Sequence, residues 1–199
     1  VREAFKTGKG VNYSDSHPCI FSGTARFFRP SYSANLLEKW IPAIPSVEKK
    51  LQDGCNFADI GCGFGVSSLM IANAFQNSKI YGFDIHRPSI ENANKEAKQM
   101  KINNAIFKVA DAENYDGEFD IITFFDCLHD MGDPLGASKY AFNHLKNDGT
   151  LILIEPSAAD DPEENFNTIG QMYYAFSTMG CVPTSKSQKM GLALGAQAG

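Results

Sequence analysis

The chain has 199 residues, 43% of them hydrophobic, which is the size and composition of one globular domain with an ordinary apolar core. Its formal net charge of −5 argues against broad nucleic-acid binding through this segment, and no apolar run reaches the roughly 18 residues of a membrane span. Five scattered cysteines without a CxxC pair predict neither a disulfide framework nor a metal site, and they favour a reduced, cytoplasmic compartment.

We expect residues 1–44 to form an N-terminal arm or lid that ends in a helix. Residues 1–30 show no clean periodicity, but their aromatic content is too high for a solvated linker. The alternative is a linker from an upstream domain. A helix is predicted over 32–41, because Pro42 cannot continue it.

Residues 45–180 are predicted to form the main domain, in which strands and helices alternate. A helix begins near Pro45 and ends at Gly54, as expected for an early proline and a late glycine. Strands are predicted at 57–60, 79–83, 105–109, 119–125 and 150–154, and helices at about 66–76, from Pro88, after Pro134 and at 163–179. This alternation predicts an α/β fold with a doubly wound, mostly parallel sheet. Residues 181–199 form a C-terminal tail.

The first strand of this domain leads into a glycine turn. After the apolar run from Phe57 come glycines at positions 61, 63 and 65, and a helical pattern opens at Val66. Glycines let the backbone approach a ligand closely, and the amides at the start of the helix point at the same place. A dinucleotide fingerprint is G-x-G-x-x-G, whereas this chain has D-x-G-x-G-x-G starting at Asp59.

The motif D-x-G-x-G-x-G resembles the first motif of class I S-adenosylmethionine (SAM)-dependent methyltransferases. The stretches FADIGCGFG, YGFDIH, VADAEN, FDIITFFDCLHD and LKNDGTLILIEP resemble successive motifs of that family. The resemblance implies a Rossmann-like fold, SAM as cofactor and S-adenosylhomocysteine as product. Such domains usually end in an antiparallel strand hairpin, and this sequence stops before one forms, so we expect a truncated domain without it.

Acidic residues follow successive strands and suit this cofactor. Asp84 is placed to accept from the ribose hydroxyls, Asp111 from the adenine amino group, and Asp59 helps to hold the methionine ammonium group. Each of these residues alone is more often a helix cap or turn residue. The complete predicted cofactor-binding set is Asp59, Gly61, Gly63, Gly65, Asp84, Ile85, Asp111, Ala112, Phe125 and Asp126.

The segment after the fourth strand, Leu128 to Asp133, resembles the His-Asp-Trp-x-Asp segment of small-molecule O-methyltransferases, with Met131 in place of Trp. The resemblance implies that His129 is the general base; the alternative is a histidine that only packs or caps. No Asn/Asp-Pro-Pro-Tyr motif follows the strand, which argues against nucleobase or glutamine methylation. We therefore expect a small O- or N-nucleophile as acceptor, neither nucleic acid nor membrane as partner, and allow for a homodimer.

The flanks of the chain resemble a narrower group. Residues 5–11, 28–30 and 194–199 resemble uncharacterised methyltransferases that carry an upstream winged-helix domain. That likeness keeps open a non-catalytic SAM-sensing module. An NAD-dependent oxidoreductase is a further alternative, which the glycine spacing opposes.

Overall fold

The computed structural model describes residues 1–197, which divide into two compact units. Unit 1 comprises Val1–Ser16, Asp126–Lys139 and the chain from Leu153 onward, and unit 2 comprises His17–Phe125 and Tyr140–Ile152. This division does not follow the linear boundaries at 44 and 180, which remain a prediction. The predicted tail extends to Ala198 and Gly199, which lie outside the described residues.

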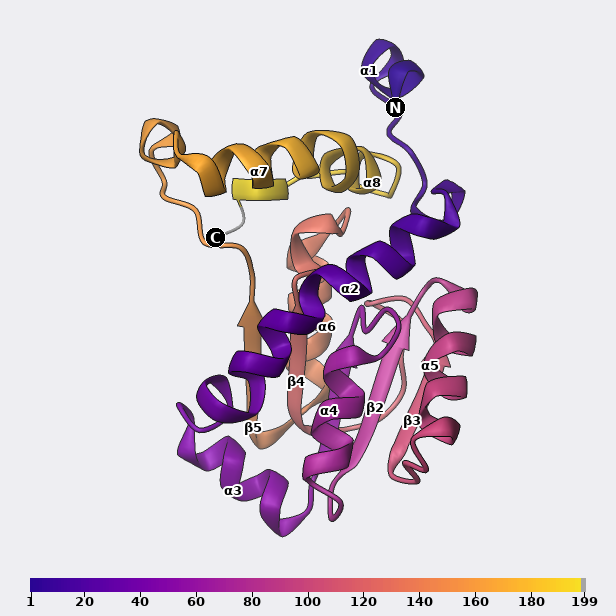
Figure 1. The fold of residues 1–199 in the computed structure, drawn as a ribbon, viewed down its shortest axis with the longest axis vertical. Coiled ribbons are helices and arrows are strands. Elements are labelled where there is room, and N and C mark those ends of the chain that lie inside the picture. Colours follow the sequence, from indigo (N-terminus) through magenta and orange to yellow (C-terminus); the bar gives the residue numbers. More distant parts are fainter. Residues whose placement is uncertain (198–199) are drawn as a thin grey trace. The chain divides into compact units, whose positions relative to one another are not determined.

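The strands form one five-stranded sheet with the order β3-β2-β1-β4-β5 (Figure 1). The pairs β1·β2, β1·β4 and β2·β3 are parallel. The predicted doubly wound α/β fold is confirmed. In residues 1–197 no strand follows β5. The strands are β1 (Asn56–Ile60), β2 (Lys79–Asp84), β3 (Ala105–Val109), β4 (Phe119–Phe125) and β5 (Leu145–Ile154).

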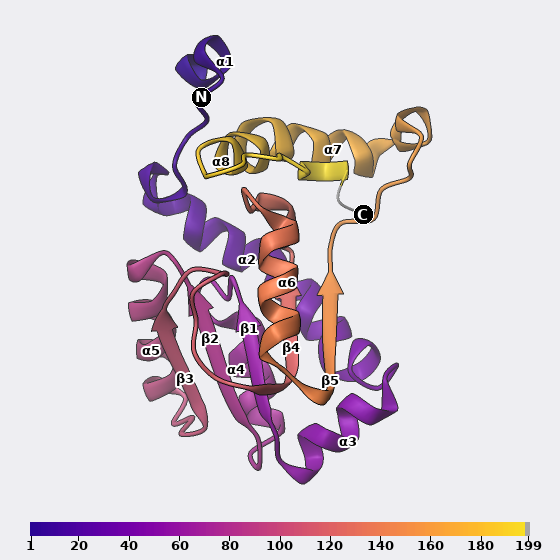
Figure 2. The same cartoon turned by 180° about the vertical axis from the view of Figure 1, so that it is seen from behind.

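Helices pack on both faces of the strands in unit 2. On one face, α4 (Val66–Ala74) and α5 (Arg87–Gln99) enclose a buried cluster with β3 whose centre is Phe107 (Figure 1). On the opposite face lie the last residues of α6 (Pro134–His144), where Ala141 is fully buried and Tyr140 donates to the Tyr115 carbonyl (Figure 2). The glycine turn after β1 is therefore held between a rigid sheet and packed helices.

The N-terminal helix begins much earlier than predicted. Instead of a helix over 32–41, α2 spans Pro18–Asn35 and continues as the π-helix η2 (Leu36–Trp40). Pro18 occupies the first turn, where no amide donor is needed, and the His17 ring accepts from the Cys19 N–H. These start signals were missed because the segment shows no clean apolar period. The following helix, α3 (Pro45–Asp53), matches its prediction.

Two further elements differ from prediction because of local side-chain contacts and strand pairing. The helix expected over 163–179 is divided into η4 (Pro162–Asn165), α7 (Thr168–Phe176) and the π-helix η5 (Ser177–Cys181), which runs on into α8 (Val182–Lys186). The Asn167 side chain accepts from the amides of Ile169 and Gly170, so α7 can begin only at Thr168. The strand expected at 150–154 begins earlier, as part of β5.

The remaining short elements belong to unit 1. They are α1 (Arg2–Thr7), η1 (Tyr13–Asp15), η3 (Leu128–Asp130) and η6 (Gly195–Gln197). The N-terminal residues contact α8, since the Val11 amide donates to the Pro183 carbonyl. Among the described residues, no helix combines the length and apolar character needed to cross a membrane.

Candidate functional site

Glycine is needed in the turn after β1 for two different reasons. Gly61, Gly63 and Gly65 have φ of 72°, 53° and 72°, a region that side chains rarely adopt. A Cβ on Gly65 would lie 2.7 Å from the Phe107 ring, so this glycine is needed for packing. A Cβ on Gly63 would have nothing within 4 Å, so this glycine faces open space. Open space at Gly63 is what a ligand-binding turn requires.

Asp59, at the end of β1, is fully buried and holds the turn from behind. Its Oδ2 accepts from the Ser67 hydroxyl at 2.7 Å and the Ser68 hydroxyl at 2.6 Å, both in the first turn of α4. Burial raises the pKa of this carboxyl to about 6, against the opposing effect of the serine hydrogen bonds. This geometry links β1 to α4, and the ammonium-binding role predicted for Asp59 remains a prediction.

Asp84, at the end of β2, connects the glycine turn to the next loop. Its Oδ2 accepts from the Gly63 amide and its Oδ1 from the His86 amide, both at 2.8 Å. The residue is 7% exposed, and burial raises the pKa of its carboxyl although both amides oppose the shift. A carboxylate offers about four acceptor positions, so about two remain for a ligand.

The other predicted cofactor-binding residues of unit 2 lie in the loops after β2 and β3 and at the end of β4. The Ile85 side chain is 45% exposed beside Asp84. The loop after β3 is joined to Asp84 through the Ala110 amide, which donates to the Asp84 carbonyl at 3.1 Å. Asp111 is exposed and accepts from the Glu113 amide, and Ala112 follows it half-buried. Phe125 is buried against Tyr32.

Asp126 belongs to unit 1 and is described there. It has a φ of 53°, an uncommon value for a residue other than glycine, and its amide donates to the Ile154 carbonyl at 2.7 Å. Strained residues of this kind gather at functional sites. The predicted cofactor role of Asp126 remains a prediction.

A separate pocket of about 570 Å³ opens within unit 2 among α2, α4 and α5. It is lined by side chains that include Arg26, Arg29, Met70, Asn92 and Glu96. None of the predicted cofactor-binding residues lines this pocket. Two neighbours of the turn glycines, Phe64 and Val66, do line it, so the pocket borders the glycine turn.

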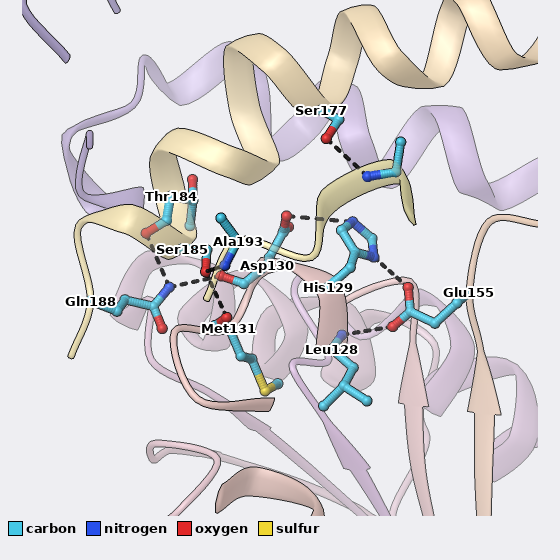
Figure 3. A network of polar contacts seen from close by, with 11 residues as sticks. Leu128, His129, Asp130, Met131, Glu155, Ser177, Thr184, Ser185, Gln188 and Ala193 are labelled. Carbon is cyan, nitrogen blue, oxygen red and sulfur yellow. Dashed lines mark hydrogen bonds and ion pairs between the residues drawn. The ribbon is translucent and has the colours of Figure 1, made fainter. Parts of the chain in front are cut away.

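The second cluster of polar side chains surrounds His129 in unit 1 (Figure 3). The His129 Nδ1 pairs with the Glu155 Oε2, while the Glu155 Oε1 accepts from the Leu128 amide at 2.8 Å. The other ring nitrogen, Nε2, lies 3.4 Å from the Asp130 Oδ1. Cys181 brings its Sγ to the same place, within 4.8 Å of the His129 and Asp130 donor atoms.

The charges around His129 determine its proton affinity. Burial disfavours the charged ring, but hydrogen bonds to Cys181 and Glu155 and the negative charge of Asp130 outweigh it and raise the pKa of His129 to about 11. The ring therefore carries its proton at neutral pH in this arrangement. A base role for His129 would need the ring in its neutral form.

Sequence reasoning identified only part of this cluster. His129 and Asp130 lie in the stretch FDIITFFDCLHD, and Glu155 lies in the stretch LKNDGTLILIEP. We singled out both stretches, and each contains a predicted strand. Cys181 carried no such signal. It reaches the cluster only because α7 continues through the π-helix η5, a feature with no clear mark in the sequence.

Several known proteins are similar to this chain. YcgJ of Bacillus subtilis, an uncharacterized methyltransferase, is 31% identical over 107 residues, which are 52% of this chain and 42% of that protein. Its crystal structure superposes with a TM-score of 0.52 at 27% identity, covering 57% of this chain and 49% of YcgJ. This chain therefore spans less than half the length of that relative.

Two further solved structures share the fold. PKMT2 from Rickettsia typhi in complex with AdoHcy superposes with a TM-score of 0.51 at 25% identity, covering 64% of this chain and 25% of PKMT2. An O-methyltransferase family protein from Burkholderia thailandensis reaches a TM-score of 0.65 over 84% of this chain and 48% of that protein. At 15% identity the latter likeness concerns the fold alone.

The family model described as "Methyltransferase domain" matches residues 51–194, a range that contains the glycine turn, Asp84, Asp111 and the His129 cluster. Because this match covers most of the chain, and because the sheet and its acidic strand ends have the predicted arrangement, the chain belongs to the methyltransferase domain family.

Proposed function

We propose that this chain transfers the methyl group of SAM to a small-molecule acceptor and releases S-adenosylhomocysteine. The observation that carries the proposal is the hydrogen bond from the Gly63 amide to Asp84. It joins a glycine turn with an open face to a carboxylate that has free acceptor positions. Membership of the methyltransferase domain family supports it, as does the AdoHcy complex of the similar PKMT2 structure.

Each side chain would contribute a specific contact to the cofactor. The remaining acceptor positions of Asp84 suit a pair of ribose hydroxyls, and the exposed Ile85 side chain beside it suits the apolar face of adenine. Asp111 would accept from the adenine amino group. Gly63 would let the backbone approach the methionine part, and Asp59 would act through Ser67 and Ser68 by fixing the turn.

Methyl transfer itself is a displacement at the sulfonium carbon. The acceptor atom uses its lone pair to form a bond to the methyl carbon as the carbon–sulfur bond breaks. The electron pair of the broken bond passes to sulfur. Correct positioning supplies much of the rate. A hydroxyl acceptor must also lose a proton, and we propose His129 as the group that takes it, once its ring is neutral. An amine acceptor that is already unprotonated would need no such base in the transfer step.

Binding and turnover measurements test this proposal. In calorimetry, SAM and S-adenosylhomocysteine should bind and NAD should not, which separates a methyltransferase from a nicotinamide-dependent oxidoreductase. Formation of S-adenosylhomocysteine in a screen of phenols, other hydroxyl compounds and amines then identifies the acceptor. Tight SAM binding without turnover on any acceptor would instead favour the SAM-sensing module suggested by the likeness to winged-helix methyltransferases. No binding of SAM at all would contradict the proposal.

A further inference from the structure

A metal-binding geometry occurs in unit 1 around His129. The His129 ring nitrogen, an Asp130 carboxylate oxygen and the Cys181 sulfur all lie within 4.8 Å of one another. They come from two segments of unit 1, η3 and η5, that are distant in sequence but bring these atoms close together in space. We propose that these three residues bind a divalent transition-metal ion of the zinc type.

The orientation of the His129 ring is that of a metal ligand. Histidines that bind metals almost always donate their other ring N–H to a carboxylate, a carbonyl or water, which fixes the ring and its tautomer. Here the Glu155 carboxylate pairs with Nδ1 through one oxygen and accepts from the Leu128 amide through the other. Nε2 is thereby directed at Asp130, as Figure 3 shows. Glu155 would thus hold the ligand without touching the ion.

The Asp130 carboxylate lacks a hydrogen bond at the same place. Its Oδ1 is buried and accepts no hydrogen bond, although the His129 Nε2 lies 3.4 Å away. A buried carboxylate oxygen without a partner is costly, and a cation satisfies it directly. The hydrogen bonds that hold this loop are made by its backbone instead, since the Asp130 carbonyl accepts from the Gln188 side chain and the Met131 carbonyl accepts from Ser185. The loop is therefore fixed while the Asp130 oxygen remains available.

The donor set indicates which ion would bind. Nitrogen, oxygen and sulfur together suit zinc, whereas magnesium and calcium prefer oxygen alone. Cys181 ends the π-helix η5, a rare turn that often occurs at functional sites. Three protein ligands leave the fourth position of a tetrahedral ion for water or another oxygen ligand. On binding, the Cys181 thiol and the His129 Nε2 would each release a proton to solvent, so that the ion is bound by a thiolate and a neutral imidazole.

None of the three proposed metal ligands is among the predicted SAM contacts, so the inference does not rest on SAM binding. It does compete with the base role of His129. A ring nitrogen that binds a metal has no lone pair left to accept a proton, so the two roles exclude each other in the same molecule.

Metal titration of the whole chain tests the site. Protein stripped with a chelator should bind one equivalent of zinc in competition with a chromophoric chelator. Cobalt should give the near-ultraviolet charge-transfer band of a thiolate ligand. Cys181→Ser should abolish that band, whereas Cys19→Ser, which changes an exposed cysteine in unit 2, should leave it intact. Glu155→Gln should lower zinc affinity by roughly 10–100-fold, as expected for the partner of a ligating histidine.

Two results would overturn the inference. The first is wild-type protein that binds no zinc above the Cys181→Ser level, and the second is a thiolate band that survives Cys181→Ser. Circular dichroism and SAM calorimetry on each variant show whether it is folded. Because the wild-type titration needs no variant, misfolding of a variant leaves the test decisive. Failure of the proposed function would appear differently, as zinc binding with no SAM binding.

Discussion

Gly63 combines a positive φ with open space at the position of its missing Cβ. Gly63→Ala should therefore weaken SAM binding, because the methyl group would occupy the face toward which the cofactor lies, and we expect a loss of roughly 10-fold or more, about 1.4 kcal/mol. Calorimetry on the folded variant measures it. Gly8→Ala is the matched control, since Gly8 also has a positive φ of 70° and nothing within 4 Å. Equal SAM affinity in both variants would show that the cofactor lies elsewhere.

His129 carries the prediction that concerns chemistry. If it is the general base, His129→Ala should lower turnover by roughly 10²–10⁴-fold and leave SAM affinity nearly unchanged, because the ring would face the acceptor. If the ring only packs, the loss should appear as about 1 kcal/mol or more of stability with near-normal turnover. Measuring kcat and Tm on the same variant separates the two. His144→Ala, which removes a half-buried imidazole in unit 2, controls for general destabilisation.

For single residues, the sequence predicts an interaction only when its partners are close along the chain. The glycines were predicted from their fixed spacing within one strand–turn–helix unit, and Asp84 from its place at the end of the next strand. The structure joins Gly63 to Asp84 by a hydrogen bond. Cys181 was not found, because its neighbours are set by a tertiary contact. The full burial of Asp59 against Ser67 and Ser68 was not predicted, because it depends on the packing of α4.

Among the elements, α2 depends on one aromatic contact at its N-terminal end. The Phe21 ring stacks on the His86 ring, with centroids 3.9 Å apart, and both residues are buried. Phe21→Ala should let this end of α2 unfold, so that trypsin cleaves faster after the exposed Arg26, with a stability cost of up to roughly 3–5 kcal/mol. Limited proteolysis measures the cleavage rate. Phe27→Ala is the control, because Phe27 is 44% exposed on the same helix.

Proteolysis also tests whether the N-terminal segment covers the cofactor, which remains a prediction. If it does, saturating SAM should slow cleavage at Arg26 in the wild-type chain. His86 directly precedes α5 and lies two residues after Asp84, so ligand binding at Asp84 would stabilise the residue on which Phe21 stacks. Cleavage at the same rate with and without SAM would count against a lid.

Element boundaries were predictable where backbone chemistry fixes them. Strands β3 and β4 have the predicted bounds, since each is rich in β-branched and aromatic residues and begins directly after a polar residue. Helix α3 likewise lies between Pro45 and Gly54. The misses occur where a side chain overrides the pattern, as Asn167 does at α7, or where strand pairing extends a segment, as in β5.

For the whole molecule, the buried carboxyl of Asp59 predicts how stability varies with pH. Its folded pKa, about 6, lies above its ordinary value of 3.8. The folded state therefore binds the proton more tightly, so this contribution to stability is complete below pH 3.8 and is lost as the pH rises through 6. A tenfold difference in proton affinity between the folded and unfolded states corresponds to about 1.4 kcal/mol, and the raised pKa of Asp84 acts in the same direction.

Urea denaturation at pH 5 and pH 7.5 measures this effect. Wild-type protein should lose more stability between these pH values than Asp59→Asn, whose amide cannot ionise and can still accept from the serine hydroxyls. A variant that shows the same pH dependence as wild type would assign the effect to other groups.

The fold class was predictable because alternating strands and helices leave few topologies open. The grouping of the chain into two units was not, because unit 1 collects residues from three separate ranges and unit 2 from two. Apolar periodicity says which face of an element is buried, but it does not say which distant element covers that face.

The interleaved course of the chain has a consequence for how the protein is made. All residues of unit 2 have been synthesised once the ribosome has added Ile152, whereas unit 1 needs the segment after Leu153 to join residues 1–16. Since domains fold as units during synthesis, the sheet can form before α8 has been made and before residues 1–16 can contact it. Newly made chains should thus pass through a stage with a protease-resistant sheet and a cleavable N-terminal end. Cys181, which completes the proposed metal site, emerges only after that stage.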